Sequence, residues 1–170
     1  MATLILTIVG DDQPGLVSAL SAPIRAHGGS WERSQLARLA GKFAGVVLVT
    51  VGDAVVADLV AELEALDLGL HLSVERTDEP APLDEATMRL DLLGADHPGI
   101  VAEISACLAA ERVSIEELTT SVNDAPMAGG NVFEAHAVLR APRTLSTDTL
   151  RSLLEALANE LMVDITLDED

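Results

Sequence analysis

Apolar residues alternate with polar ones in some stretches of the chain and recur every three or four positions in others. The run from Thr3 to Val9 places a large aliphatic residue at every second position, which predicts a strand. From Leu16 to Ile24 such residues recur every four positions, which is typical of an amphipathic helix. The chain is therefore expected to begin with a strand and a helix.

Two further strands follow, Ser30 to Leu39 and Lys42 to Val51, joined by a tight turn at Ala40-Gly41. Asp53 is expected to cap a second helix, because its side chain can accept from the free N–H groups of the first turn. That helix carries an apolar stripe at Val55, Leu59, Leu63 and Leu66. A strand from Leu70 to Glu75 closes a β-α-β-β-α-β unit.

The second half of the chain repeats this order. Met88, Leu90 and Leu92 match the alternation of the first strand, and a helix is expected from Gly99 to about Glu111. Strands are expected at 114–122 and 131–140, with a longer loop at 123–130, and then a final helix and strand. The last helix should turn five leucines inward, namely Leu150, Leu153, Leu154, Leu157 and Leu161.

The pattern predicts an α+β protein with two ferredoxin-like units, each an antiparallel sheet with helices on one face. The expected domains are residues 1–77 and 87–170. Residues 78–86 contain Pro80 and Pro82 among several acidic residues, which is the composition of a linker.

The turn between the first strand and the first helix occurs twice. Gly10-Asp11-Asp12-Gln13-Pro14-Gly15-Leu16-Val17 returns as Gly94-Ala95-Asp96-His97-Pro98-Gly99-Ile100-Val101. Pro fixes φ, Gly allows close approach of the backbone, and the first helical N–H groups point outward at the positive end of the helix dipole. Such a turn can hold a carboxylate. The alternative is a tight connection that only starts a helix.

Composition and charge narrow the classes of function. Apolar residues make up 49% of the chain, but with two Phe, one Trp and no Tyr the cores must be aliphatic. The formal net charge of −18 repels phosphate backbones and anionic lipids, so neither direct nucleic-acid binding nor membrane docking is expected. The single cysteine, Cys107, excludes an intrachain disulfide and is expected to be a buried core thiol.

No catalytic, metal or targeting motif is present in the sequence. The four histidines, His27, His71, His97 and His136, lack metal-ligand spacing, and no GxSxG, P-loop or GxGxxG motif occurs. The adjacent Asp11 and Asp12 are expected to be solvated acids rather than a catalytic pair. The N-terminus lacks a basic leader and no apolar run reaches the ~18 residues of a membrane span. We expect a cytoplasmic, non-enzymatic protein without a cofactor or metal.

These motifs resemble those of tandem ACT-domain proteins of the glycine cleavage system transcriptional repressor type. The resemblance rests on Gly-x-Asp-x-Pro-Gly-[Leu/Ile]-Val in both halves and on the segment from Trp31 to Phe43. Ser30 and Ser114 stand where the family has Asn after the first helix of each unit. The resemblance implies a regulatory protein whose units bind small amino acids where the first strand–helix loop meets a neighbouring unit.

The resemblance also implies which residues would bind the ligand. They are Asp12, Gln13, Gly15 and Leu16 in the first unit, and Asp96, His97, Gly99 and Ile100 in the second. The N–H groups of Leu16 and Ile100 would face the ligand carboxylate. The side chains of Asp12 or Asp96 would accept from its α-ammonium group.

The two predicted sheets differ on the face turned away from their helices. In the first unit this face is apolar, with Ile5, Thr7, Val9, Val46 and Leu48, whereas the second carries Arg89, Asp91, Glu134, His136 and Val138. An exposed apolar sheet face usually marks a contact, so Ile5, Thr7, Val46 and Leu48 are expected to form an interface with another subunit or protein. The alternative is that the second unit folds over this face.

Two functions from different classes follow from the sequence. The first is an amino-acid-sensing regulatory module that acts on transcription of amino-acid (glycine) metabolism genes indirectly, through a protein partner or a homo-oligomer. The second is a ligand-free adaptor or oligomerisation scaffold. Binding of an amino acid would separate them.

Overall fold

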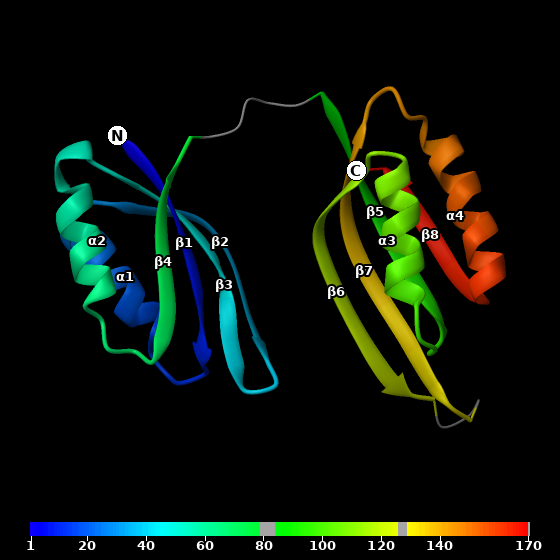
Figure 1. Cartoon of the computed structure of the whole chain (residues 1–170), viewed down its shortest axis with the longest axis horizontal. Helices are drawn as coiled ribbons and strands as arrows, with labels where there is room; N and C mark the ends of the chain where they lie inside the picture. The colour runs from blue at the N-terminus through cyan, green and yellow to red at the C-terminus, as the bar shows by residue number, and fades with distance from the viewer. Residues whose placement is uncertain (79–83, 126–128, 170) are drawn as a thin grey trace. The chain divides into compact units, whose positions relative to one another are not determined.

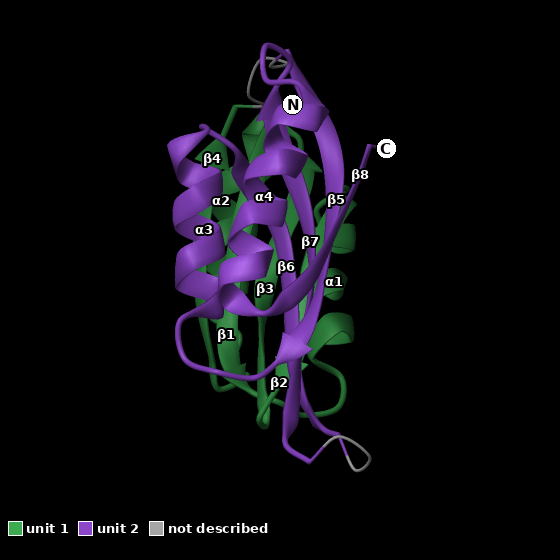
Figure 2. Ribbon diagram, turned by 90° about the vertical axis from the view of Figure 1, so that its right-hand side faces the viewer, with its two compact units in different colours: residues 1–81 green, residues 82–170 purple. Residues whose placement is uncertain are grey.

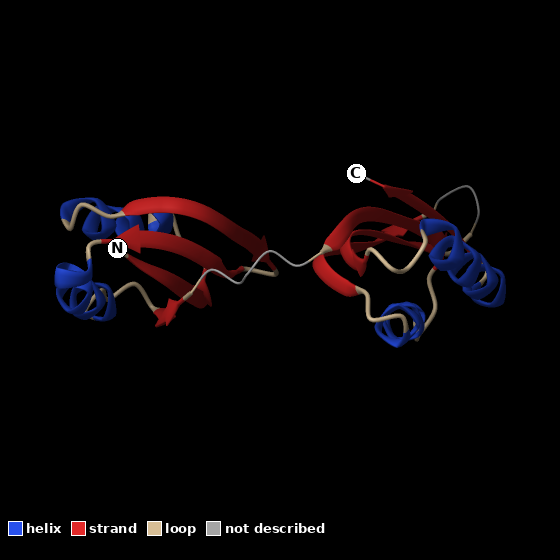
Figure 3. Cartoon of the chain, turned by 90° about the horizontal axis from the view of Figure 1, so that it is seen from above, coloured by secondary structure: helices blue, strands red, loops and turns tan. Residues whose placement is uncertain are grey.

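The computed structural model describes residues 1–78, 84–125 and 129–169, and the chain divides into two compact units, Met1–Ala81 and Pro82–Asp170 (Figure 2). Each unit contains a four-stranded antiparallel sheet whose two helices lie on one face (Figure 3). The strand order is β2-β3-β1-β4 in the first unit and β6-β7-β5-β8 in the second. The predicted α+β fold, with two ferredoxin-like β-α-β-β-α-β units, is confirmed.

The elements of both units follow the predicted order (Figure 1). The first unit consists of β1 (Ala2–Asp11), α1 (Leu16–Ala26), β2 (Ser30–Leu39), β3 (Lys42–Val51), the 3-10 turn η1 (Asp53–Val55), α2 (Val56–Glu64) and β4 (Leu70–Thr77). The second consists of β5 (Glu85–Ala95), α3 (Ile100–Ala110), β6 (Ser114–Asp124), β7 (Asn131–Pro142), α4 (Thr147–Leu161) and β8 (Val163–Glu169).

The alternating residues of the strands build the cores. In the first unit the helix-facing side chains of β1 and β3 are buried against α1 and α2; this core contains Leu4, Leu6, Ile8, Leu20, Ile24, Val47, Val49, Val51, Leu59 and Leu63. The second core repeats this arrangement with Met88, Leu90, Leu92, Ile100, Ile104, Leu108, Phe133, Leu139, Leu150 and Leu154. Each fully buried aliphatic side chain contributes about 1.5–3 kcal/mol to the stability of the folded unit. The buried side chains of the strands therefore determine the register of the sheets.

The strand register confirms which residues point away from the helices. Ile5 pairs with Leu48 and Thr7 with Val46 on the open face of the first sheet. Val46 is 38% exposed, so this apolar face is uncovered within its own unit. On the open face of the second sheet, Asp91 pairs with His136.

Several local predictions were wrong. Asp53 does not cap α2, because a 3-10 turn precedes that helix and the Asp53 carboxylate instead pairs with the Met1 ammonium and with Arg76, each at 2.5 Å. Leu153 is 38% exposed, because it lies on the outer side of α4. Cys107 is half-buried against the second core rather than fully buried. Burial, with a smaller effect of Glu111, raises the pKa of its thiol.

The two segments predicted as connections are partly strand. Of the predicted linker, residues 79–83 lie outside the described part of the chain, and Glu85 and Ala86 belong to β5. Of the predicted loop at 123–130, Asn123 and Asp124 extend β6, and residues 126–128 lie outside the described part. Pairing with the neighbouring strand β7 lengthens these elements beyond the apolar pattern that indicated them.

Candidate ligand-binding corners

Each duplicated motif forms a corner between a strand and a helix, which we call the first corner (residues 12–15, between β1 and α1) and the second corner (residues 96–99, between β5 and α3). Each begins with the same backbone hydrogen bond to a hairpin: Asp12 N–H donates to Gly41 C=O and Asp96 N–H to Asn131 C=O, both at 2.9 Å. The two corners therefore share one backbone design.

The last glycine of each motif is required by its backbone angle. Gly15 has φ of 91° and Gly99 has φ of 103°, in the left-handed region that disfavours other residues, and a Cβ added at either would meet nothing within 4 Å. The first glycine is required by space. A Cβ at Gly10 would lie 2.6 Å from the Gly69 carbonyl oxygen, and one at Gly94 would lie 2.5 Å from Val163 Cγ1.

The helices that start at the corners have no side-chain cap. Gly15 and Gly99 occupy the N-cap positions, and neither helix shows a side-chain capping hydrogen bond within the described residues. The first N–H groups of α1 and α3 therefore remain available to an acceptor. The first turn of α1 contains no acidic residue, whereas that of α3 contains Glu103. At the positive end of the dipole, α1 is thus better prepared for an external anion than α3.

The first corner is flanked by ion pairs with the β2–β3 hairpin. Arg38 Nε lies 2.7 Å from Asp12 Oδ2, and Lys42 Nζ lies 2.5 Å from Asp11 Oδ1. Sequence reasoning missed both cations as parts of this corner. The signal was available, since a tight turn at Ala40-Gly41 places Lys42 opposite Asp11 once β3 pairs with β1.

Gln13 contacts its own chain. Its Nε2 donates to the Leu68 carbonyl at 2.6 Å, in the connection between α2 and β4. The side chain therefore joins the first corner to the segment that follows the second helix of the unit.

His97 occupies the equivalent position in the second unit. Its Nε2 lies 2.9 Å from the carbonyl oxygen of Leu161, the last residue of α4, and its Nδ1 lies 3.2 Å from the Pro98 carbonyl oxygen. These backbone hydrogen bonds, the one to Leu161 first, raise the pKa of His97, and the charge of Asp96 adds to them.

Within each unit, the structure brings the predicted site residues together in one corner. Leu16 and Ile100 are buried at the helix starts, and Asp12 and Asp96 begin the corners. The ligand-binding roles of these residues stay predictions, and the side chains of Gln13 and His97 already hydrogen-bond to carbonyl groups of the chain. Among the described residues, no group of three or more His, Cys, Asp or Glu could hold a metal ion.

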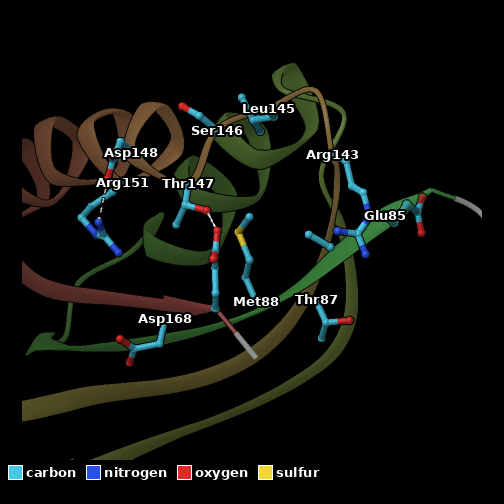
Figure 4. A pocket seen from close by; sticks show the side chains of 12 residues that line it. Glu85, Thr87, Met88, Arg143, Leu145, Ser146, Thr147, Asp148, Arg151 and Asp168 are labelled. Atoms are coloured by element: carbon cyan, nitrogen blue, oxygen red, sulfur yellow. Dashed lines mark hydrogen bonds and ion pairs between the residues drawn. The ribbon is translucent and has the colours of Figure 1, made fainter.

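One cleft of the second unit lies away from its corner. It has a volume of about 1000 Å³ and is lined by the start of β5, the start of α4 and the end of β8 (Figure 4). The strand rise of about 3.3 Å per residue puts it roughly 30 Å from the corner at the other end of β5. Both arginines that line this cleft form ion pairs: Arg143 pairs with Asp84 at 2.8 Å and Arg151 pairs with Asp148 at 3.0 Å. These pairs neutralise the positive charge that would attract an anionic ligand.

Comparisons with known proteins give one match to the first unit and others to nearly the whole chain. Residues 2–76 match the family model of the ACT domain. Over 161 residues the chain is 23% identical to the glycine cleavage system transcriptional repressor of Escherichia coli strain K12, covering 93% of this chain and 85% of that protein. The described part of the chain shows no helix long and apolar enough to cross a membrane.

Solved structures share the architecture of the whole chain. A protein of unknown function from Galdieria sulphuraria matches with a TM-score of 0.90 and 29% identity, covering 99% of this chain and 98% of that one. A candidate glycine cleavage system transcriptional repressor matches with a TM-score of 0.67 and 18% identity, covering 99% and 97%. The likeness thus extends over both units.

Proposed function

Because residues 2–76 match the ACT domain and the whole chain is similar to a glycine cleavage system transcriptional repressor, we propose that it is a tandem ACT-domain, non-catalytic regulatory protein that binds a small amino acid at its corners. Its effect on transcription of amino-acid (glycine) metabolism genes is indirect and passes through a protein partner. A net charge of −18 opposes direct binding to nucleic acid.

The observation that carries this proposal is the duplication of an uncapped helix start behind a left-handed glycine. Both units keep the positive φ at the N-cap, the backbone bond to the hairpin and the absence of a side-chain cap within the described residues. A connection that only starts a helix gains from a Ser, Thr, Asp or Asn cap, worth about 1 kcal/mol. The Ser146 cap of α4 shows that this chain uses such a cap elsewhere.

The proposed roles follow from the chemistry of a zwitterion. The N–H groups of Leu16 and Ile100 face the ligand carboxylate at the glycines Gly15 and Gly99, where the helix dipole favours negative charge. The carboxylates of Asp12 and Asp96 accept from the α-ammonium group. Gln13 and His97 belong to the same corners and hold their shape.

The test is isothermal titration of the full chain with a panel of amino acids that includes glycine and serine. We expect binding by the wild type, and its loss when Asp12→Asn and Asp96→Asn are combined. Asp11→Asn is the matched control, because Asp11 is an adjacent exposed acid whose partner is Lys42, and it should bind like the wild type. Absence of heat with every amino acid at millimolar concentration would leave the scaffold function instead.

The open face of the first sheet favours an additional role in assembly. Its stripe of Ile5, Thr7, Val46 and Leu48 is uncovered within its unit, and we propose that a second copy of this chain packs on it. Light scattering on a sizing column should show a dimer or larger species for the wild type and a smaller species for Ile5→Asp. Arg89→Asp on the open face of the second sheet is the control. A monomeric wild type at micromolar concentration would refute the contact.

A further inference from the structure

The residue after the aspartate of each corner makes the same connection in both units. Gln13 donates to the Leu68 carbonyl, and His97 lies against the Leu161 carbonyl, so each side chain links its corner to the end of the second helix or the segment after it. A glutamine amide donates at any ordinary pH, whereas an imidazole changes its donors when it titrates. The same hydrogen bond between a corner and a backbone carbonyl is therefore made by a titratable side chain in the second unit and by a non-titratable one in the first.

Both partners of the His97 ring are carbonyl oxygens, which only accept hydrogen bonds. Only the protonated imidazole carries an N–H on both nitrogens, so only that form donates to Leu161 and Pro98 together. A neutral ring can make one of the two bonds, and its other nitrogen then presents a lone pair to an oxygen. Deprotonation thus removes one of two bonds and places like partial charges together.

The charges around His97 also favour the protonated ring. The Leu161 carbonyl is at the C-terminal end of α4, the negative end of its dipole, where a cation is stabilised. Asp96 precedes the ring in the same corner. On each of the three elements next to the ring or its partner, the titratable residue nearest in sequence to His97 or Leu161 is an exposed carboxylate. These residues are Glu103 on α3, Glu160 on α4 and Asp164 on β8. The N-terminus of α3 opposes them, because its positive end disfavours a cation.

We infer that Gln13 and His97 are positioning residues that fasten each corner to the end of the second helix of its unit or to the segment just after it, and that protonation tightens this fastening in the second unit alone. The first corner keeps a constant link through its amide. The second is held by two hydrogen bonds at acidic pH and by one at alkaline pH. This inference goes beyond the proposed function and requires no ligand.

The test is amide hydrogen exchange read by NMR on the full chain, together with proton titration of the four histidines, from about pH 5 to about pH 9. Protection factors correct for the intrinsic pH dependence of exchange. For Glu103 N–H, which donates to Gly99, we expect protection to fall two- to tenfold as His97 loses its proton, the effect of one hydrogen bond. For Ala19 N–H, which donates to Gly15, protection should not change.

Three variants separate this link from other histidine effects. His97→Gln gives the second unit the side chain of the first and should abolish the pH dependence of the second corner. Gln13→His should make the protection of the first corner depend on pH. This variant provides a test even where His97→Gln fails to fold. His136→Asn removes a second histidine whose pKa is raised, chiefly by its hydrogen bond to Asp91, and should leave the dependence unchanged.

Two outcomes would overturn the inference. Either His97→Gln retains the pH dependence of protection at the second corner, or this dependence follows the titration of His136 and vanishes in His136→Asn. No amino acid is added in this experiment, so a negative result would not refute the proposed binding of an amino acid. Conversely, a calorimetric titration without heat would not refute the link made by His97.

Discussion

The first glycine of the duplicated motif can be tested by its need for space. Gly10→Ala adds a methyl group that would lie 2.6 Å from both the Gly69 carbonyl oxygen and Leu70 Cδ2, and 3.0 Å from Leu70 Cα. Contacts of this kind normally lie at about 3.5–4.0 Å, so β4 or the connection before it must move by roughly 1 Å. Backbone cannot rotate away as a flexible side chain can.

The expected cost follows from this displacement. Overpacking by one methyl group typically lowers the free energy of unfolding by about 1–3 kcal/mol. With a urea dependence of about 1–1.5 kcal/mol per molar for a unit of this size, the midpoint of unfolding of the first unit should fall by roughly 0.7–3 M.

The assay uses the single tryptophan of the chain. Trp31 packs against the core of the first unit, so its fluorescence reports unfolding of that unit alone. Gly41→Ala is the control for backbone strain without crowding, because Gly41 has a positive φ, of 79°, which Gly10 lacks, and a Cβ there would meet nothing within 4 Å. It should cost only the left-handed strain of about 1–2 kcal/mol. A Gly10→Ala variant as stable as the wild type would refute the spatial argument.

Two further predictions concern the second unit. Ser146→Ala removes the hydroxyl that accepts from Thr149 N–H at 3.1 Å at the start of α4, and should lower the free energy of unfolding by about 1 kcal/mol, measured by urea unfolding followed by circular dichroism. His136 hydrogen-bonds to Asp91 at 2.5 Å and to Glu134 at 3.2 Å, and the bond to Asp91, first among the causes, raises its pKa. The stabilisation is therefore present below the ordinary pKa of histidine and is lost as pH rises through the raised value, so His136→Asn should destabilise the unit at about pH 5.5 and much less at about pH 9.

The alternation of apolar residues was sufficient to predict the fold. The rows beginning at Leu4 and Met88 are buried as expected, because a shift by one residue would turn every aliphatic side chain to solvent. Local sequence signals, such as those for helix caps, predicted less well where tertiary contacts compete for the same side chain. Asp53 has the composition of a cap, but the Met1 ammonium and Arg76 take its carboxylate and lower its pKa, through the hydrogen bond to Met1 first.

Two features of the sheets left no pattern in the sequence. The register of β2 shifts between Trp31 and Arg33, and that of β6 between Ile115 and Glu117. The extra residue in each is a glutamate that reaches the strand beside it: Thr50 Oγ1 donates to Glu32 at 2.7 Å, and Arg140 Nε donates to Glu116 at 2.8 Å. A bulge depends on such cross-strand partners, which become visible only when the strands are paired.

The sequence predicted the backbone of the corners and assigned side chains within them to the ligand, and the structure adds the neighbouring side chains that make the two corners unequal. In the first corner, Arg38 and Lys42 of the hairpin pair with Asp12 and Asp11 and so neutralise these two carboxylates, and the first turn of α1 contains no acid. The second has Glu103 in the first turn of α3, which already places a negative charge near the free N–H groups. At neutral pH the first corner is therefore the stronger proposed site for a carboxylate. Protonation of His97 adds a positive charge to the second corner, so a decrease in pH should bring the affinities of the two corners for an amino acid closer together.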